Sequence, residues 1–281
     1  MSPVHDQSYR RYQGTRQPLG RAWLVILRTG LRGFLSRKVF LALLLLAWLP
    51  FLVRTIQIYL VVTYPQAGQI LEINAALFRD FVEFQGVFAF FVTIYVGAGL
   101  IASDRRANAL QVYLSKPLLR TEYIVGKLGI VAVYLAAVTI LPALLLVLMQ
   151  VIVTGSLVLL REHTYIIPAV VVGSMISVIC PALMILALSS LSKSSRYVAV
   201  MYAGLVFFSE AVCGIVSFVT GSSRVAWISV NRNLEVVTDA LFRQPPRYET
   251  PVIVSALVLL CLIVVSVSVL ERRVRGVEVV A

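Results

Sequence analysis

Two ionisable residues, Arg54 and Glu210, lie inside long apolar stretches of this 281-residue chain. A charge in hydrocarbon is costly unless it faces protein or water, so both are candidates for a functional role inside a membrane. At 1.5 Å per helical residue, they lie at nearly equal depth, about 23 Å and about 20 Å from the same face. We predict that they pair, with outward snorkelling of Arg54 as the alternative. Ser217 lies on the helix face of Glu210 and is a third candidate.

A charged segment at residues 101–128 separates the second and third of these apolar stretches. It is much longer than a turn between two helices requires. It combines apolar side chains with both signs of charge, which is typical of a surface that binds a protein partner. A solvated amphipathic loop is the alternative. The residues expected to contact the partner are Asp104, Arg105, Arg106, Leu110, Tyr113, Leu114, Pro117 and Arg120.

Patterns for enzyme chemistry are missing from the sequence. The three cysteines have no CxxC spacing, and neither histidine has neighbouring ligand residues, so we expect no metal site. Gly126-Lys127 is followed by Leu128, whereas a phosphate-binding loop needs Ser or Thr there. We therefore expect no catalytic residue and no cofactor bound by this chain.

The composition indicates a membrane protein. Hydrophobic residues make up 59% of the chain and charged residues only 14%. Six apolar runs are long enough to cross a bilayer, and continuous runs of this length favour helices over a barrel. We expect an all-α polytopic bundle of six transmembrane helices at about residues 39–63, 87–103, 128–153, 166–190, 197–219 and 251–270.

The basic residues predict the orientation of these spans. With the N-terminus inside, the inner segments hold eighteen Lys and Arg residues and the outer loops hold six. Basic residues resist translocation, so both termini are expected in the cytoplasm. The net charge of +12 is explained by this topology and by contact with anionic lipids, and no nucleic-acid partner is needed.

We expect one domain that covers residues 1–281. Residues 1–38 form a cytoplasmic tail and an interfacial elbow helix, 39–270 the six-helix bundle, and 271–281 a cytoplasmic C-terminus. The elbow helix is predicted at 19–36, where basic and apolar residues recur at helical spacing; an ordinary basic flank of the first span is the alternative. Apolar residues at 234, 237 and 241 predict a short helix in the long outer loop, across the outer end of the bundle.

The charged segment resembles the signature of type 2 ATP-binding-cassette (ABC) transporter permeases. In that family, a cytoplasmic coupling helix joins spans 2 and 3 and carries an acidic residue, a Gly-Thr-Leu step, a Leu-Leu-Ser-x-Pro stretch, an Arg and a Gly-Lys pair. Asn108 and Ala109 replace the Gly-Thr step here, and Asp104 replaces the more usual Glu. The matching positions are Asp104, Leu110, Leu114-Ser115, Pro117, Arg120 and Gly126-Lys127.

The resemblance implies a permease subunit in a bacterial or archaeal plasma membrane. Such a subunit pairs with a second permease copy or homologue, and the complex carries two ABC ATPase subunits that bind ATP and Mg. The expected function is movement of a substrate, with export as the expected direction. The alternative is a permease-like subunit whose complex does mechanical or regulatory work without passing a solute.

Overall fold

The computed structural model describes residues 22–64, 66, 73–109 and 119–274. Within these ranges the backbone consists of helices and their connections, without strands. Six helical segments are long and apolar enough to cross a membrane, which confirms the expected all-α, multi-pass class. The segments are Lys38–Thr63, Ala75–Arg106, Arg120–Thr154, Ile166–Leu191, Ser195–Thr220 and Val252–Arg273.

Several of these spans contain more than one helix. The first consists of α2 (Lys38–Ala47) and α3 (Leu49–Thr63), the second of α4 (Ala75–Gly97) and α5 (Ala102–Arg106), and the third of α7 (Arg120–Val138) and α8 (Ile140–Thr154). The last three are α10 (Ile166–Leu191), α11 (Ser195–Thr220) and α13 (Val252–Arg273). The shorter elements are α1 (Ala22–Leu35), α9 (Val158–Glu162), the 3-10 helix η2 (Ser223–Ile228) and α12 (Val230–Leu241).

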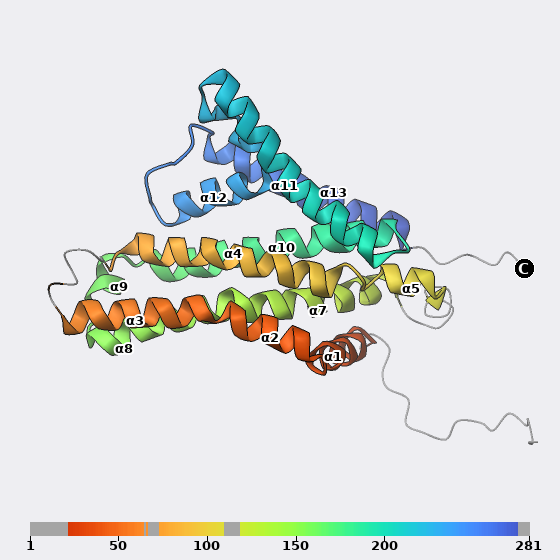
Figure 1. Cartoon of the computed structure of the whole chain (residues 1–281), viewed down its shortest axis with the longest axis horizontal. Coiled ribbons are helices and arrows are strands. Elements are labelled where there is room, and N and C mark those ends of the chain that lie inside the picture. The colour runs from red at the N-terminus through yellow and green to blue at the C-terminus, as the bar shows by residue number, and fades with distance from the viewer. Residues whose placement is uncertain (1–21, 65, 67–72, 110–118, 275–281) are drawn as a thin grey trace, which may run out of the picture.

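The helix α10 is the centre of the fold and contacts α4, α7, α8, α11, α12 and α13. Most of its length is buried, including Ile185 and Leu186. Figure 1 shows α11, α12 and α13 on one side of α10, diverging from the bundle that contains α3, α4, α7 and α8. The spans α2–α3, α11 and α13 therefore keep broad apolar faces for lipid or for a second protein.

The second span begins at Ala75, twelve residues before the expected start at 87. Charged residues before position 87 interrupt the apolar run, so the run is shorter than the helix. Asn74 caps this helix, since its side chain accepts a hydrogen bond from the Leu77 N–H at 3.2 Å. The charges of Arg79 and Glu83 are satisfied by residues of the α12 region. The helix therefore continues through a polar stretch because tertiary partners neutralise it.

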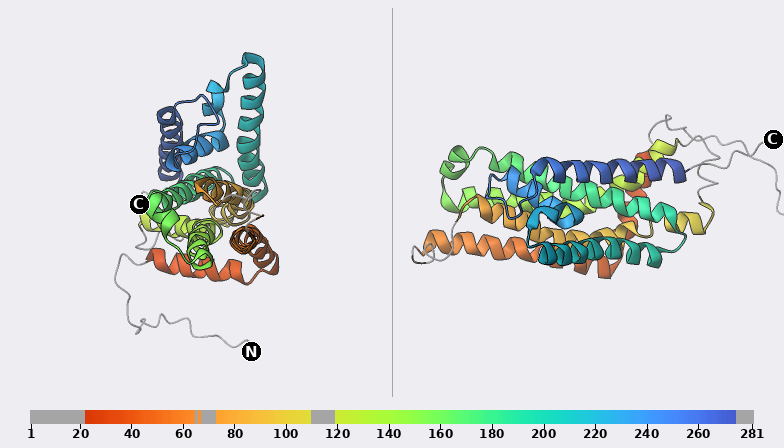
Figure 2. Two further views of the ribbon diagram at one scale, coloured as in Figure 1. Left: turned by 90° about the vertical axis from the view of Figure 1, so that its left-hand side faces the viewer. Right: turned by 90° about the horizontal axis from the view of Figure 1, so that it is seen from above.

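The helix α1 covers most of the segment expected to form the elbow. It runs across the direction of the spans, as both views in Figures 1 and 2 show, and packs on α7. The contact is close because a Cβ added to Gly126 would lie 3.0 Å from Ile26 Cβ. The position of α1 in the headgroup layer of a membrane remains a prediction.

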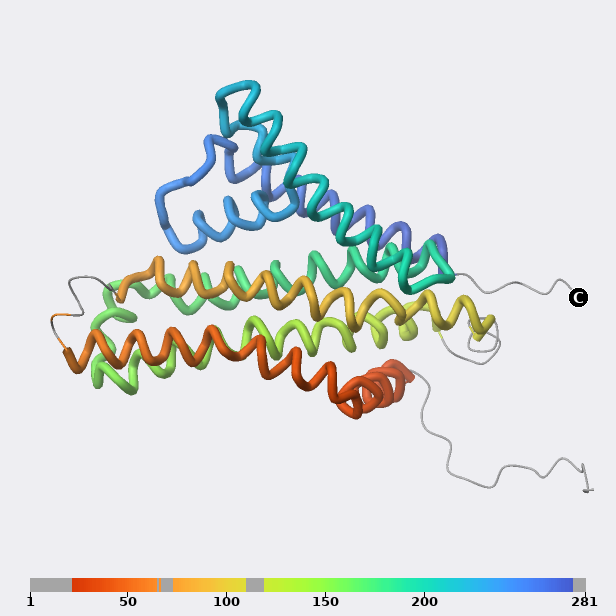
Figure 3. The backbone as a smooth tube through the Cα atoms, in the orientation of Figure 1, coloured from red at the N-terminus to blue at the C-terminus, as the bar shows by residue number. Residues whose placement is uncertain are grey.

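The short helix expected in the loop at 220–250 is confirmed as α12, which begins at Val230. Ser229 caps it by accepting a hydrogen bond from the Arg232 N–H at 3.3 Å. Figure 3 shows the chain reverse after α11 and return through α12 to α13. The helix packs along α4, α10, α11 and α13, instead of lying across the outer end of the bundle as expected. Its polar face is turned toward charged groups of α4 and α11, and this charge pairing draws it inward.

Candidate functional site

Asp104 joins the two ends of the charged segment. Its Oδ2 lies 2.7 Å from Lys127 Nζ and accepts a hydrogen bond of 2.7 Å from the Tyr123 hydroxyl. The side chains of Asp104 and Lys127 are only 16% and 13% exposed, so water screens this pair weakly. The ion pair therefore connects α5 to the first half of α7.

Two arginines of α5 bind the end of α10 and the turn that follows it. Arg105 donates to the Ser190 carbonyl, and Arg106 Nε donates to the Lys193 carbonyl at 2.9 Å. The buried Ser189 hydroxyl accepts from the backbone N–H groups of Ile101 and Ala102 at 3.1 and 3.0 Å. Cations near a helix C-terminus contribute about 0.3 to 1 kcal/mol each, so the two arginines favour this position of α5. It attaches α5 to the turn between α10 and α11.

Asp104, Arg105 and Arg106 are thus brought together, with Arg120 exposed at the first position of α7. Leu110, Tyr113, Leu114 and Pro117 lie outside the described residues, and their role as partner contacts stays a prediction.

The expected pair of Arg54 and Glu210 is wrong. Arg54 Nη1 instead donates to Gln57 Oε1 at 2.7 Å, on its own helix α3. Figures 1 and 2 show α3 and α11 on different sides of the bundle, so equal depth does not bring the two residues together.

Glu210 is paired with Arg232 of α12. Arg232 Nε lies 2.8 Å from Glu210 Oε1, and the Ser229 hydroxyl donates to the other carboxylate oxygen. Arg232 Nη1 also donates to Ser217 Oγ at 3.4 Å. Burial alone would lower the pKa of Arg232, but the hydrogen bond and charge of Glu210 raise it above its usual value. The shared face of Glu210 and Ser217 therefore binds Arg232, which is one of the six basic residues of the outer loops.

A second ion-pair network ties the chain between α12 and α13 to α4. Arg247 Nη2 lies 2.9 Å from Asp239 Oδ1, and the same guanidinium binds Glu83 of α4. Arg79 binds Asp239 from α4 at 3.1 Å. Asp239 is only 2% exposed, so the two arginines compensate a buried charge. The sequence signal for this network was the pair of opposite charges at Arg79 and Glu83, four residues apart and so on one face of a helix.

A metal site finds no support in the described part of the chain, where no three His, Cys, Asp or Glu residues lie together. Cys180 and Cys213 are buried in the helices, and the Cys213 thiol donates to the Val225 carbonyl at 3.3 Å. These cysteines act as packing residues.

No family model matches the sequence, and no curated protein matches it either. The fold and the span-like helices define a class, a multi-pass, all-α membrane protein.

Proposed function

We propose that the protein is the transmembrane permease subunit of an ABC transporter. ATP would be bound and hydrolysed by two copies of a separate ATPase subunit, and the permease would couple that reaction to movement of a substrate across the membrane. The permease-like pattern between Asp104 and Lys127 supports this proposal, together with the six spans.

The observation that carries the proposal is the attachment of the charged segment to several spans at once. The Asp104–Lys127 ion pair joins α5 to α7, and the hydrogen bonds of Arg105 and Arg106 join α5 to α10 and the following turn. A displacement of the segment by a bound partner is therefore passed to three spans together. A solvated loop would not need these connections. A docking element needs them. It passes a change in the bound partner to the spans only if it is rigid and if its contacts differ between the two states of the complex.

The proposal is tested by purifying the chain alone and together with an ABC ATPase encoded by a neighbouring reading frame. The single chain should not hydrolyse ATP, since its sequence contains no phosphate-binding loop. The co-purified complex should hydrolyse ATP and should move a substrate across the bilayer of reconstituted vesicles.

Hydrolysis by the single chain after stringent removal of contaminants would contradict the proposal. So would failure of the ATPase to be retained by the full-length chain. A complex that hydrolyses ATP without any flux would favour mechanical or regulatory work.

A further inference from the structure

A cavity of about 330 Å³ lies between α4, α10, α11 and α12. This volume falls within the range of about 300 to 1,000 Å³ that is usual for small-molecule sites. The four elements come from distant parts of the sequence, so the cavity is a product of the fold. Its lining includes none of the described residues of the charged segment at residues 101–128.

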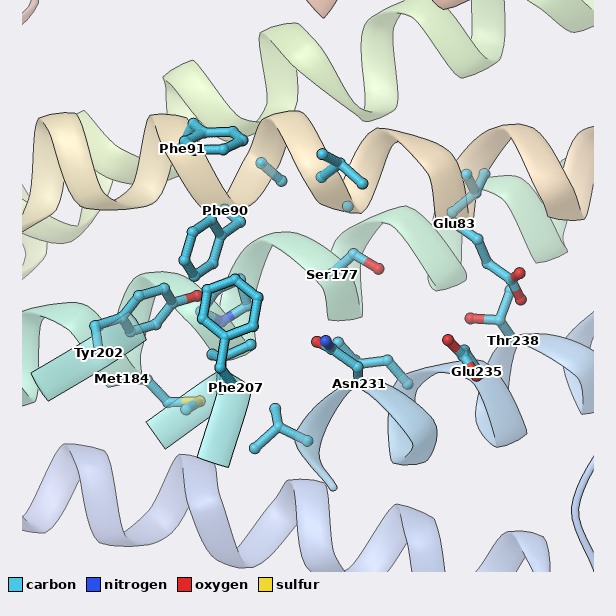
Figure 4. Close-up of a pocket in the computed structure, with 18 residues that line it drawn as sticks. Glu83, Phe90, Phe91, Ser177, Met184, Tyr202, Phe207, Asn231, Glu235 and Thr238 are labelled. Carbon is cyan, nitrogen blue, oxygen red and sulfur yellow. The ribbon is translucent and has the colours of Figure 1, made fainter. Parts of the chain in front are cut away.

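The two ends of the cavity differ in chemistry, as Figure 4 shows. Glu83, Glu235 and Thr238 gather at one end, and aromatic side chains gather at the other. Glu83 and Phe91 are eight residues apart on α4, which corresponds to about 12 Å along a helix. The wall thus offers acidic groups and an apolar surface within the length of one small amphiphile.

The aromatic end is built from packed rings. Phe90 stacks on Tyr202 with ring centroids 5.6 Å apart, and meets Phe207 edge-on at 5.2 Å. Met184 adds a polarisable thioether beside them. Such a surface favours the flat apolar body of a ligand, and the ring faces attract positive charge.

The acidic end keeps a carboxylate without a cation. Glu83 is neutralised by Arg247, but Glu235 forms no ion pair with any residue that the structure describes. It accepts a hydrogen bond of 2.7 Å from the Tyr248 hydroxyl. Burial and the charge of Glu235 raise the pKa of Tyr248, so the hydroxyl stays a neutral donor. The nearby Arg232 is already bound to Glu210.

Three residues that line the cavity, Val87, Phe91 and Phe207, are also exposed at the surface. All three belong to helices that are long and apolar enough to span a membrane, so the surface beside the cavity is apolar. Where this surface meets lipid, a ligand that partitions into the bilayer lies next to the cavity.

We propose that this cavity binds an amphiphilic organic cation, with its apolar body against Phe90, Tyr202 and Phe207 and its charge toward Glu235. A carboxylate at the edge of an apolar cavity is poorly solvated, and a monovalent cation compensates it. An anion of the same shape would meet the same rings but would be repelled by Glu235. The binding of this ligand does not depend on the proposed function. Only the further statement that the ligand is the transported substrate rests on it.

Two ions of matched shape and opposite charge test this proposal. (2-Naphthylmethyl)trimethylammonium and 2-naphthylmethanesulfonate, each with a flat apolar body and a charge at one end, are added to the full-length chain in detergent, and equilibrium binding is measured against empty micelles. The cation should bind saturably at one site per chain. The sulfonate should bind more weakly by about tenfold or more, because the Coulomb term changes sign.

Glu235→Gln should weaken cation binding by about tenfold, since it removes the charge and keeps the shape. The matched control is Glu249→Gln, which removes a carboxylate from an exposed pair with Arg224, away from the cavity lining. It should leave the affinity unchanged. Size-exclusion and thermal unfolding establish that each variant is folded. Asn231→Lys, which adds a cation to the lining, should also weaken binding of the cation. This variant replaces Glu235→Gln in the test if Glu235→Gln does not fold.

Equal affinity for the two ions, or cation binding that survives both cavity variants, would overturn the proposal. Absence of saturable binding would do the same. If the cation binds but no ATPase complex forms, the proposed function fails alone; if the complex hydrolyses ATP but the cation does not bind, the cavity proposal fails alone.

Discussion

Glu210 of α11 and Arg232 of α12 form an ion pair whose Nε and Oε1 atoms lie 2.8 Å apart. The pair fixes the loop helix against a membrane span. A Cβ added to Gly214, one turn after Glu210, would lie 3.8 Å from Arg232 Nη2, which is an ordinary contact distance, so the guanidinium packs along this face of α11.

A double-mutant cycle tests this pair. Glu210→Leu and Arg232→Leu should each lower thermal stability in detergent more than the double change does. Removing one charge leaves the other uncompensated, although the 37% exposure of Glu210 reduces the penalty. We expect a coupling free energy of about 1 to 2 kcal/mol.

The matched control cycle combines Glu210→Leu with Arg54→Leu, which should be additive because Arg54 binds Gln57. Coupling in this control cycle, or additivity in the first, would contradict the assignment.

The sequence located Glu210 as a costly charge but assigned it the wrong partner. Depth along a span is one coordinate only, and it does not say which side of the bundle a helix occupies. Arg232 lies outside the apolar runs, so its approach to α11 depends on how the outer loop folds inward. That fold depends on contacts between α4, α10 and α12, which have no signature in local spacing.

The helices themselves were more predictable, because long apolar runs leave the backbone no alternative in lipid. All six expected spans are found as helices, but their ends differ where charges are involved. The second span extends back through Arg79 and Glu83, whose ion pairs with Asp239 and Arg247 come from distant sequence. Composition can thus predict a span, whereas tertiary charge pairing decides where it begins.

The network around Arg247 should be important for stability. Arg247→Met leaves the buried Asp239 with Arg79 alone and leaves Glu83 without its ion-pair partner. The change should reduce the free energy of unfolding by about 2 kcal/mol, seen as a lower midpoint of thermal unfolding.

Arg224→Met is the matched control for this change, since Arg224 pairs with Glu249 at an exposed site. Exposed pairs contribute about 0 to 1 kcal/mol, so this variant should unfold close to the native midpoint. Similar losses for both arginines would show that the network around Asp239 adds nothing.

Close packing of α1 on α7 depends on Gly126. A Cβ here would lie 3.0 Å from Ile26 Cβ and 3.1 Å from the Trp23 carbonyl oxygen, and a backbone atom cannot move aside cheaply. Gly126→Leu should therefore destabilise the protein by about 1 to 3 kcal/mol, measured by thermal unfolding.

Gly33→Leu provides the comparison for this substitution, because nothing lies within 4 Å of a Cβ at Gly33. It should be neutral or slightly stabilising, since Leu favours helix more than Gly does. If Gly126→Leu were equally well tolerated, α1 would not be packed against α7 as described.

The last prediction concerns the ion pair between Asp104 and Lys127, on which the proposed coupling depends. Asp104→Asn keeps the shape of the side chain and its hydrogen bond from Tyr123, but removes the charge that holds Lys127. In a complex with the proposed ATPase, we expect assembly to persist, because the apolar residues predicted to contact the ATPase are unchanged. Substrate-linked stimulation of ATP hydrolysis should fall by about tenfold, which corresponds to a difference of about 1.4 kcal/mol in activation free energy. Glu271→Gln, an exposed carboxylate change at the end of α13, should leave the stimulation intact. Full stimulation in Asp104→Asn would show that α5 and α7 need no electrostatic connection to move together.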